Sequence, residues 1–449
     1  MRVNIIYEVN NREFNNCLLL QRELVRRGHD ARIYNKTEDI LLTDNSNSVT
    51  LIPNSYRNED LAHYRYCFNT NGGLIVIYPC EQVTNHFLPT FFDHSDNNEV
   101  KKLPHLCWSI DYSEFLGSVG FDTNVLKIVG AIQLDFCRPE FKRFYVSREH
   151  LSNKYALPNK KKWMLFISDF VLDNDEKYNR LLESGDVEET VLTKRRSHER
   201  ASTRIILEWF DKFLDLHPEY ILIYRKHPVE ILSESIVEFQ NRHEHQVFCI
   251  SEYGIKDWIM NCDRIVTWNS TSAVECFVAM KNIHLLRPIP FDDNSGYKEY
   301  SFYQAMKGIT SFAQFESSII NDCYGYNKDF IEEINKLYSI DETPSYLRVS
   351  DAIEEFYSSY RNGSVSKRFK RDRAFYLLKN VIIPKILVKK FLQSIYLILG
   401  IRFGKQTEKG VSINEWMATA DNRRDMKKRS RLIDDIIKNG EVKNGKISN

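Results

Sequence analysis

The sequence predicts a two-domain α/β protein in which each domain is built on a parallel β-sheet. Its 449 residues exceed the usual size of one domain. Short apolar runs of strand length alternate with amphipathic stretches of helix length over residues 1–290, which is the order that places helices on the faces of a parallel sheet. A polar, charged passage at 138–162 divides this alternation into two series.

The first series predicts a Rossmann-like N-terminal domain at residues 1–135. A strand at Val3–Tyr7 leads into an amphipathic helix from about Phe14 to Arg27, which Gly28 closes before a second strand at Ala31–Tyr34. Further strands are expected at 49–52, 74–78 and 125–129.

The second series predicts a similar domain at residues 136–350. Its expected strands are 163–167, 220–224, 246–250, 264–268 and 283–286, and its expected helices are 201–216, 230–242, 255–261 and 273–280. The polar run 174–198 is either a mobile lid or a solvated insertion. Ligands of open α/β sheets bind beyond the carboxyl ends of the strands, so functional residues are expected there.

The composition excludes several classes of protein. The chain has 62 basic and 61 acidic residues with 43% hydrophobic residues, which describes a globular protein and argues against general nucleic-acid binding. Nine cysteines form no CxxC pair, which fits reduced thiols. The N-terminus, MRVNIIYEVNN, lacks the features of a secretory signal. We therefore expect a cytoplasmic protein that binds no nucleic acid.

Residues 364–449 are expected to form a basic helical extension with a polar tail. The segment 374–403 contains lysines and arginines but no acid, and its longest uncharged run, 391–401, is far shorter than the about 20 residues that span a bilayer. It either lies on the anionic inner face of the cytoplasmic membrane or closes its apolar side over the two domains.

The stretch YRKHPVE, residues 224–230, is the first candidate phosphate site. His227 follows a predicted strand, and Pro228 disfavours a helical conformation at the histidine. An imidazole N–H at this place can donate to a phosphate oxygen, and Arg225, on the same strand face, would add positive charge, whereas Lys226 is expected in solvent. The alternative is an ordinary turn with solvated cations.

A cluster of hydroxyls forms the second candidate. Ser270, Thr271 and Ser272 join a predicted strand to a helix, where hydroxyls and backbone N–H groups suit an anion, although simple helix capping explains them too. Glu275, about one turn later, either accepts hydrogen bonds from ribose hydroxyls or complements the helix dipole. Both candidates follow strands of one sheet, so they are expected to meet at one pyrophosphate.

Acids at strand ends are candidate general bases. Glu8 and Glu81 follow strands of the first domain, and Arg12 and Glu13 begin its first helix. Asp169 and Asp173 follow the first strand of the second domain. A carboxylate at such a place can remove a proton from a hydroxyl group. For any one of these acids, capping a helix or pairing with a neighbouring cation is the simpler interpretation.

Metal and cofactor motifs are weak. The only DxD triplet, 173–175, either holds a divalent ion on a diphosphate or consists of solvated acids. The sequence contains no HExxH, no HxxxH, no P-loop and no GxGxxG, which argues against ordinary NTPase and dinucleotide chemistry. We expect neither a metal nor a cofactor.

The order of these segments resembles the bacterial surface carbohydrate biosynthesis family. The resemblance lies in Glu8 with Arg12-Glu13, Leu18-Leu-Leu to Arg27-Gly-His, Glu81, Val129-Gly-Ala-Ile-Gln-Leu-Asp and Arg138-Pro-Glu-Phe. The His227-Pro228 turn and the helix start at 270–272 resemble those of GT-B glycosyltransferases, among them bacterial sialyltransferases and capsule Kdo transferases. In architecture the resemblance spans roughly residues 1–350.

The resemblance implies a GT-B fold and a metal-independent glycosyltransferase. Such an enzyme moves a sugar from a nucleotide-activated donor, CMP-linked in those two groups, to a surface polysaccharide, a lipopolysaccharide or a lipid-linked glycan. It implies that His227 contacts the nucleotide phosphate and that 270–272 bind the phosphate of the activated sugar. The Asp/Glu-Asp/Glu-Gly triplet of sialyltransferases is absent. A teichoic-acid-type polyol-phosphate transferase and a non-catalytic sugar-binding subunit of a polysaccharide assembly complex remain alternatives.

Overall fold

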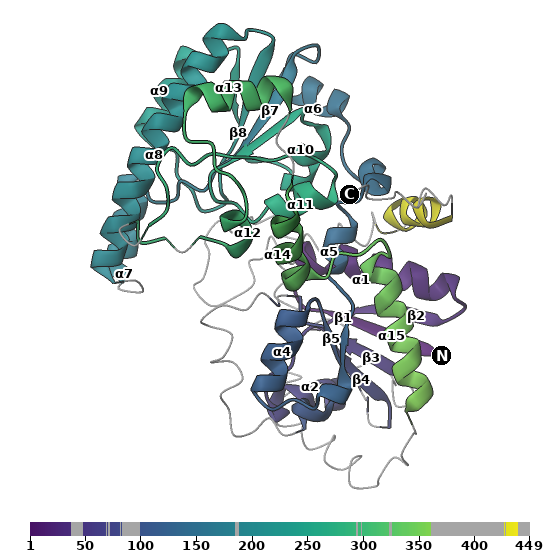
Figure 1. Cartoon of the computed structure of the whole chain (residues 1–449). Coiled ribbons are helices and arrows are strands. Elements are labelled where there is room, and N and C mark those ends of the chain that lie inside the picture. The colour runs from purple at the N-terminus through teal and green to yellow at the C-terminus, as the bar shows by residue number, and fades with distance from the viewer. Residues whose placement is uncertain are drawn as a thin grey trace, which may run out of the picture. The chain divides into compact units, whose positions relative to one another are not determined.

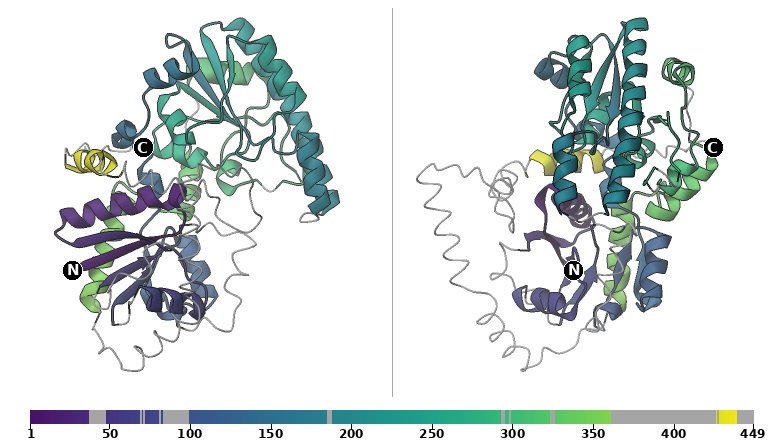
Figure 2. Two further views of the ribbon diagram at one scale, coloured as in Figure 1. Left: turned by 180° about the vertical axis from the view of Figure 1, so that it is seen from behind. Right: turned by 90° about the vertical axis from the view of Figure 1, so that its left-hand side faces the viewer.

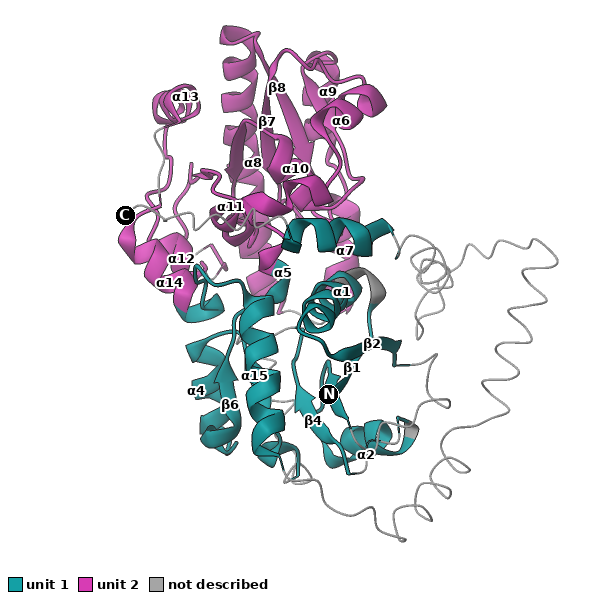
Figure 3. Cartoon of the chain, turned by 90° about the vertical axis from the view of Figure 1, so that its right-hand side faces the viewer, with its two compact units in different colours: residues 1–133, 336–449 teal, residues 134–335 magenta. Residues whose placement is uncertain are grey.

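The computed structural model contains two compact α/β units (Figure 3). Unit 1 comprises residues 1–133 and 336–449, and unit 2 comprises residues 134–335. Residues 336–350, which the sequence analysis groups with the second domain, thus belong to unit 1. The structure describes residues 1–36, 48–68, 70, 72–80, 82, 99–184, 188–292, 295–297, 299–322, 326–360, 426 and 428–438. Glu81 and the basic segment 374–403 lie outside the described residues.

Unit 1 is built on a six-stranded parallel sheet in the order β2-β1-β3-β4-β5-β6 (Figure 1). Its elements are β1 (Arg2–Tyr7), α1 (Asn10–Arg26), β2 (Asp30–Asn35), β3 (Val49–Ile52), α2 (Asn58–Cys67), β4 (Leu74–Ile77), η1 (Val100–Lys102), β5 (His105–Cys107), α4 (Ile110–Ser118), η2 (Thr123–Val125), β6 (Leu126–Ile128), α5 (Ile132–Asp135) and α15 (Ser345–Ser359). The sequence does not predict β5, because a run of three residues carries no periodicity.

Two groups of helices cover the two faces of this sheet. The residues of α2 and α4 form a buried cluster with inward-facing residues of β1, β3, β4 and β5. The helix α1 contributes Leu18, Leu19 and Leu24 to the core, and α15 packs against α1. The alternation of strands and helices in the sequence therefore gives a doubly wound sheet.

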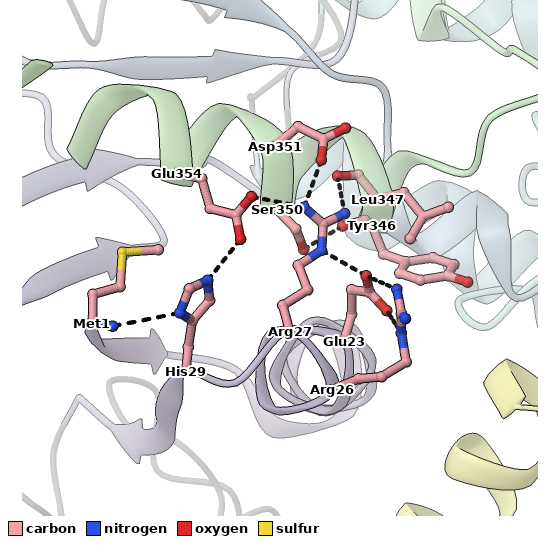
Figure 4. A network of polar contacts seen from close by, with 10 residues as sticks. All are labelled: Met1, Glu23, Arg26, Arg27, His29, Tyr346, Leu347, Ser350, Asp351 and Glu354. Carbon is pink, nitrogen blue, oxygen red and sulfur yellow. Dashed lines mark hydrogen bonds and ion pairs between the residues drawn. The ribbon is translucent and has the colours of Figure 1, made fainter. Parts of the chain in front are cut away.

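A cluster of charges joins α1 to α15 (Figure 4). Arg27 donates hydrogen bonds to Glu23 at 2.7 Å, to Asp351 at 2.5 Å and to Glu354 at 3.0 Å. The Nε2 of His29 lies 2.6 Å from the same Glu354. Three carboxylates around one largely buried guanidinium form a network, which holds α15 on α1 more firmly than an isolated surface pair would.

The Val129-Gly-Ala segment has a packing role at the end of the unit 1 sheet. Gly130 has a φ of +76°, and a Cβ built there would lie 2.5 Å from the Ser345 hydroxyl and still closer to the Arg348 guanidinium. The Tyr78 hydroxyl donates to the Gly130 carbonyl and accepts from the Ile132 N–H, each at 3.0 Å. Only glycine combines this backbone conformation with so close an approach.

Unit 2 is built on a five-stranded parallel sheet in the order β11-β10-β7-β8-β9 (Figure 1). Its elements are η3 (Pro139–Phe144), α6 (Arg148–Tyr155), β7 (Lys162–Ile167), α7 (Asp175–Ser184), α8 (Glu189–Leu216), β8 (Tyr220–Arg225), α9 (Glu234–Arg242), β9 (Val247–Cys249), α10 (Ile255–Asn261), β10 (Arg264–Thr267), α11 (Ala273–Val278), β11 (His284–Leu285), α12 (Ser301–Gln304), α13 (Phe312–Asn321) and α14 (Lys328–Tyr338), whose last three residues belong to unit 1. Every strand that the sequence predicts here is present.

One face of the unit 2 sheet is covered by α8, α9 and α13, whose apolar residues join alternate residues of β7, β8 and β10 in one buried cluster. The helices α10 and α11 contribute nothing to that cluster and lie on the other face (Figure 2). The polar run 174–198 is mostly helical, because α7 and the first turns of α8 occupy it and pack Leu172, Tyr178 and Leu192 together.

Two further observations concern membranes and thiols. Within the described parts of the chain, no helix is long and apolar enough to cross a bilayer. The seven cysteines whose side chains are described are free, and five of them are buried.

Replacing Gly130 by Ala should destabilise unit 1. The change forces a side chain into the left-handed region and against Ser345 and Arg348, at a cost of about 2 kcal/mol or more. Urea unfolding measures this loss. The matched control is Gly117→Ala in α4, where the added Cβ meets only Thr123 at 3.4 Å, so its stability should change by less than about 1 kcal/mol. Equal stability of the two variants would refute the packing role of Gly130.

Candidate functional site at the carboxyl edge of unit 2

The order of the unit 2 sheet creates a crevice beyond β7 and β10. The strand β7 is the first strand of unit 2 along the chain and the central strand of its sheet. From it the chain passes to α8 on one face, whereas α11, which follows β10, lies on the other face. Neighbouring strands whose connections leave to opposite faces open a crevice at their carboxyl ends, where ligands of such sheets bind. Asp169 and Asn269 follow these two strands.

Asp169 and Asn269 point toward each other across this crevice. The Asn269 amide donates to the Asp169 carboxylate at 3.4 Å, and the buried Oδ1 of Asn269 has no hydrogen-bond partner among the described residues. The pKa of Asp169 is raised to about 7, because the effect of burial is larger than the opposing effect of the hydrogen bond from Asn269. A carboxyl group that titrates near neutrality at a ligand crevice is a candidate general base.

The His-Pro segment on the other side of β7 is a tight turn. The Glu230 N–H donates to the His227 carbonyl at 2.9 Å, which closes a β-turn with Pro228 at its second position. The Glu230 carboxylate is fully buried, accepts from the His227 N–H at 2.9 Å and accepts from the Tyr224 hydroxyl at 2.9 Å. The sequence analysis places Glu230 in a helix. That assignment is wrong, because α9 begins only at Glu234.

The turn determines which ring nitrogen of neutral His227 carries the proton. Its Nδ1 accepts the Val229 N–H at 3.4 Å, so the proton of the neutral ring is assigned to Nε2. Burial lowers the pKa of the half-buried imidazole, which favours this neutral form. The Nε2 has no partner among the described residues, so it remains a donor for a ligand.

The two predicted phosphate contacts lie on either side of β7. The sequence expectation that His227 and Ser270 follow strands of one sheet is confirmed. They are not on adjacent strands, because β7 lies between β8 and β10, which separates their strand ends by roughly 10 Å. Asp169 therefore stands between the histidine and the serine cluster.

The hydroxyl cluster forms a turn before a short helix. The Ser270 N–H donates to Thr267 Oγ1 and the Ser272 N–H donates to Ser270 Oγ, each at 3.3 Å. Thr271 is exposed, whereas Ser272 is buried at the N-cap of α11 and its side chain caps no backbone N–H of that helix. Burial raises the pKa of Glu275 while Lys256 and Ser272 lower it, so this acid is held against its own helix.

The two cations before His227 have protein partners. The Arg225 guanidinium donates to the carbonyls of Ile250 at 3.4 Å and Tyr253 at 2.7 Å, in the segment after β9. Lys226 donates to the Glu230 carbonyl at 3.2 Å and thereby ties the turn to its own strand end. Lys226 was expected in solvent, but it folds back because the turn places an unpaired carbonyl within its reach.

Unit 1 has a topological switch point of its own. The winding of its strands reverses between β1 and β3, and Glu8 follows β1, where it accepts from Lys36 at 3.0 Å and from Asn54 at 2.8 Å. Glu13 is buried, accepts the Glu8 N–H at 2.7 Å and accepts from Cys80 at 3.2 Å. The side chain of Arg12 is not described. Glu8 thus lies at the strand end of this switch point with the Lys36 ammonium beside it. Glu13 fixes the backbone of Glu8 by accepting its N–H.

Sequence reasoning missed Glu199. This buried acid of α8 accepts the N–H groups of Leu172 at 2.5 Å and Asp173 at 2.7 Å, and the Tyr297 hydroxyl at 2.5 Å. Burial raises its pKa well above the usual value for a glutamate. It fixes the segment that carries Asp169. It follows directly on the polar run 174–198, so nothing in the sequence distinguishes it from solvated acids.

Comparisons with known proteins assign the chain to no family. No family model matches it, and no curated protein matches it. Among solved structures, a candidate UDP-N-acetylglucosamine 2-epimerase from Listeria monocytogenes is 11% identical over 80% of this chain and 98% of its own, with a TM-score of 0.48. The UDP-GlcNAc 2-epimerase from Neisseria meningitidis bound to UDP-GlcNAc is 8% identical over 80% and 99%, with a TM-score of 0.47.

A third similar structure is the wall teichoic acid polymerase TagF, at 11% identity over 80% of this chain and 89% of its own, with a TM-score of 0.44. Similarity at this level assigns no function, so the functional argument rests on the residues of the site. Among the described residues, no group of three or more His, Cys, Asp or Glu side chains is arranged to hold a metal ion.

Replacing Glu230 by Gln should change the pH dependence of stability. Burial raises the pKa of Glu230 from 4.5 to about 7, so the folded state binds this proton more tightly than the unfolded chain. The stabilisation is complete below the unfolded pKa and is lost as pH rises through 7. At about 1.4 kcal/mol per pKa unit, the shift corresponds to roughly 3 kcal/mol.

Urea unfolding at about pH 5 and pH 8 measures this effect. The natural chain should lose stability between these two values, and Glu230→Gln should lose roughly 3 kcal/mol less. Glu238→Gln, an exposed change on α9, should follow the natural chain. An unchanged pH dependence in Glu230→Gln would contradict the assignment.

Proposed function

We propose that the chain is a glycosyltransferase that uses a nucleotide-activated sugar, with the nucleotide phosphates bound at the carboxyl edge of unit 2. The observation that carries this proposal is His227, whose backbone the buried Glu230 carboxylate holds, whose half-burial favours the neutral ring, and whose Nε2–H has no partner among the described residues. A single oriented N–H donor suits a phosphate oxygen. The hydroxyls of residues 270–272 and the Thr271 N–H would bind the phosphates from the far side of β7, because the N–H groups of Ser270 and Ser272 already have side-chain acceptors.

The proposed reaction needs a base and a group that stabilises the departing phosphate. Asp169, with its pKa of about 7, would take the proton from the acceptor hydroxyl as the sugar bond forms. His227 would donate its Nε2–H to the phosphate oxygen that gains negative charge when the bond to the sugar breaks. Glu8 of unit 1 is the second candidate base, and it forms an ion pair with Lys36.

The finer assignments follow from the family resemblance. A CMP-linked donor and a surface polysaccharide, lipopolysaccharide or lipid-linked acceptor belong to the proposal on that ground, as does work beside the inner membrane through 374–403. Arg225, Glu275, Arg12, Glu13 and Glu81 remain proposed site residues of this enzyme. Arg225 would act by holding the loop after β9, because its guanidinium bonds the carbonyls of that loop.

Donor binding provides the first test. A thermal-shift panel of CMP-, UDP-, GDP- and CDP-linked sugars should raise the melting temperature with at least one member, since a ligand that binds only the folded chain stabilises it. His227→Ala should weaken that donor about tenfold by removing one hydrogen bond to a charged group. The exposed His245→Ala is the control. The proposal fails if no nucleotide stabilises the natural chain.

The pH dependence of turnover provides the second test. Because Asp169 has a pKa of about 7 in the ligand-free chain, the kcat/KM of the natural chain should fall about tenfold per pH unit below pH 7 as the base takes up a proton. Asp169→Asn should lose this dependence and about 10²–10⁴-fold of kcat while keeping donor affinity. The exposed Asp215→Asn serves as control. Product mass identifies the transferred group, and a polyol-phosphate increment would overturn glycosyl transfer.

A further inference from the structure

A polar pocket of unit 2 is lined by residues at the starts of α7 and α9 and on the side of α8. Figure 1 labels these three helices. The pocket has a volume of about 630 Å³, within the range of ligand sites. All of its lining residues belong to unit 2: Asp173, Asn174, Asp175, Arg200, Ala201, Arg204, Ser233, Glu234 and Ser235. The function proposed above uses none of them.

Asp173 supplies a buried acceptor to this pocket. Its side chain is only 8% exposed, and its Oδ2 has no hydrogen-bond partner among the described residues. The other oxygen, Oδ1, lies 3.9 Å from the Arg200 guanidinium. A buried carboxylate oxygen without a donor is costly unless a ligand or water satisfies it.

Donors line the opposite side of the same pocket. The exposed Arg204 guanidinium has no hydrogen-bond or ion-pair partner among the described residues. Ser233 begins α9 without a side-chain cap, and the first backbone N–H paired along this helix is that of Val237. The N–H groups of the first turn therefore have no partner within the helix. The hydroxyls of Ser233 and Ser235 lie 3.0 Å apart and share one hydrogen bond, which leaves each with capacity for a ligand.

This combination selects one chemical class of ligand. An anion would meet the buried Asp173 carboxylate, and a metal ion would meet the guanidinium groups of Arg200 and Arg204. No aromatic ring lines the pocket for a base to stack on. A sugar satisfies every group, because each hydroxyl both donates and accepts hydrogen bonds.

We propose that this pocket binds a neutral, hydroxyl-rich sugar, with Asp173 accepting from its hydroxyls and Arg204 donating to them. The inference rests on the proposed function in that the sugar belongs either to the donor or to the glycan acceptor. The pocket begins four residues after Asp169, in the segment that Glu199 fixes. It is a specificity site next to the proposed base.

A neutral glycan array followed by calorimetry on the full chain tests this proposal. We expect one of two results for the natural chain. Either it binds a neutral oligosaccharide, or it binds a nucleotide sugar more tightly than it binds the corresponding free nucleotide. Arg204→Ala and Asp173→Asn should each weaken that binding on the order of tenfold, with thermal melting confirming that both variants fold. Lys194→Ala removes an exposed cation from the same helix outside the pocket and should bind as the natural chain does.

The results distinguish an acceptor sugar from a donor sugar. They also distinguish failure of the pocket proposal from failure of the proposed function. Weakened binding of the free oligosaccharide in the variants identifies an acceptor subsite, and weakened binding of only the nucleotide sugar identifies a donor-sugar subsite. Unchanged sugar binding in both variants would overturn the pocket. The pocket proposal would also be overturned if nucleotides stabilise the chain and sugars neither bind nor raise its melting temperature further. That result would leave the proposed function standing.

Discussion

The buried carboxylate of Glu230 is the interaction on which the geometry of the candidate site depends. It accepts the His227 N–H and the Tyr224 hydroxyl, so it ties the turn after β8 to the strand that precedes it. The Tyr224 hydroxyl also lies 2.9 Å from Ser168, the last residue before Asp169. One buried acid therefore sets the position of the neutral imidazole and connects it to the segment that carries the proposed base.

A second buried acid, Glu199, fixes the loop that follows β7. Its carboxyl group accepts hydrogen bonds from the N–H groups of Leu172 and Asp173 and from the Tyr297 hydroxyl. Burying a carboxyl group is costly, but hydrogen bonds from the backbone and from a hydroxyl offset the cost and fix the loop they come from. The two acids thus make rigid segments of two strand-end loops, which is what a site that orients phosphate and sugar requires.

The two units repeat one arrangement with different chemistry. In each, a parallel sheet reverses its winding beside its first strand, and an acid follows that strand: Glu8 in unit 1 and Asp169 in unit 2. Glu8 accepts hydrogen bonds from Lys36 and Asn54. Burial raises the pKa of Asp169, whose carboxylate accepts a hydrogen bond from the neutral Asn269. The same position in the fold therefore carries an ion-paired carboxylate in one unit and a carboxyl group with a raised pKa in the other.

The sequence by itself determined the α/β class, most strands and the strand-end positions of His227, Ser270, Glu8 and Asp169, because apolar periodicity and strand ends are local properties of the chain. It did not determine the strand order, which places Asp169 between the two phosphate candidates, or the return of residues 336–360 to unit 1. The roles of Glu199 and Glu230 also required the tertiary structure. Burial decides whether a glutamate is a solvated charge or an anchor, and burial depends on residues distant in the chain.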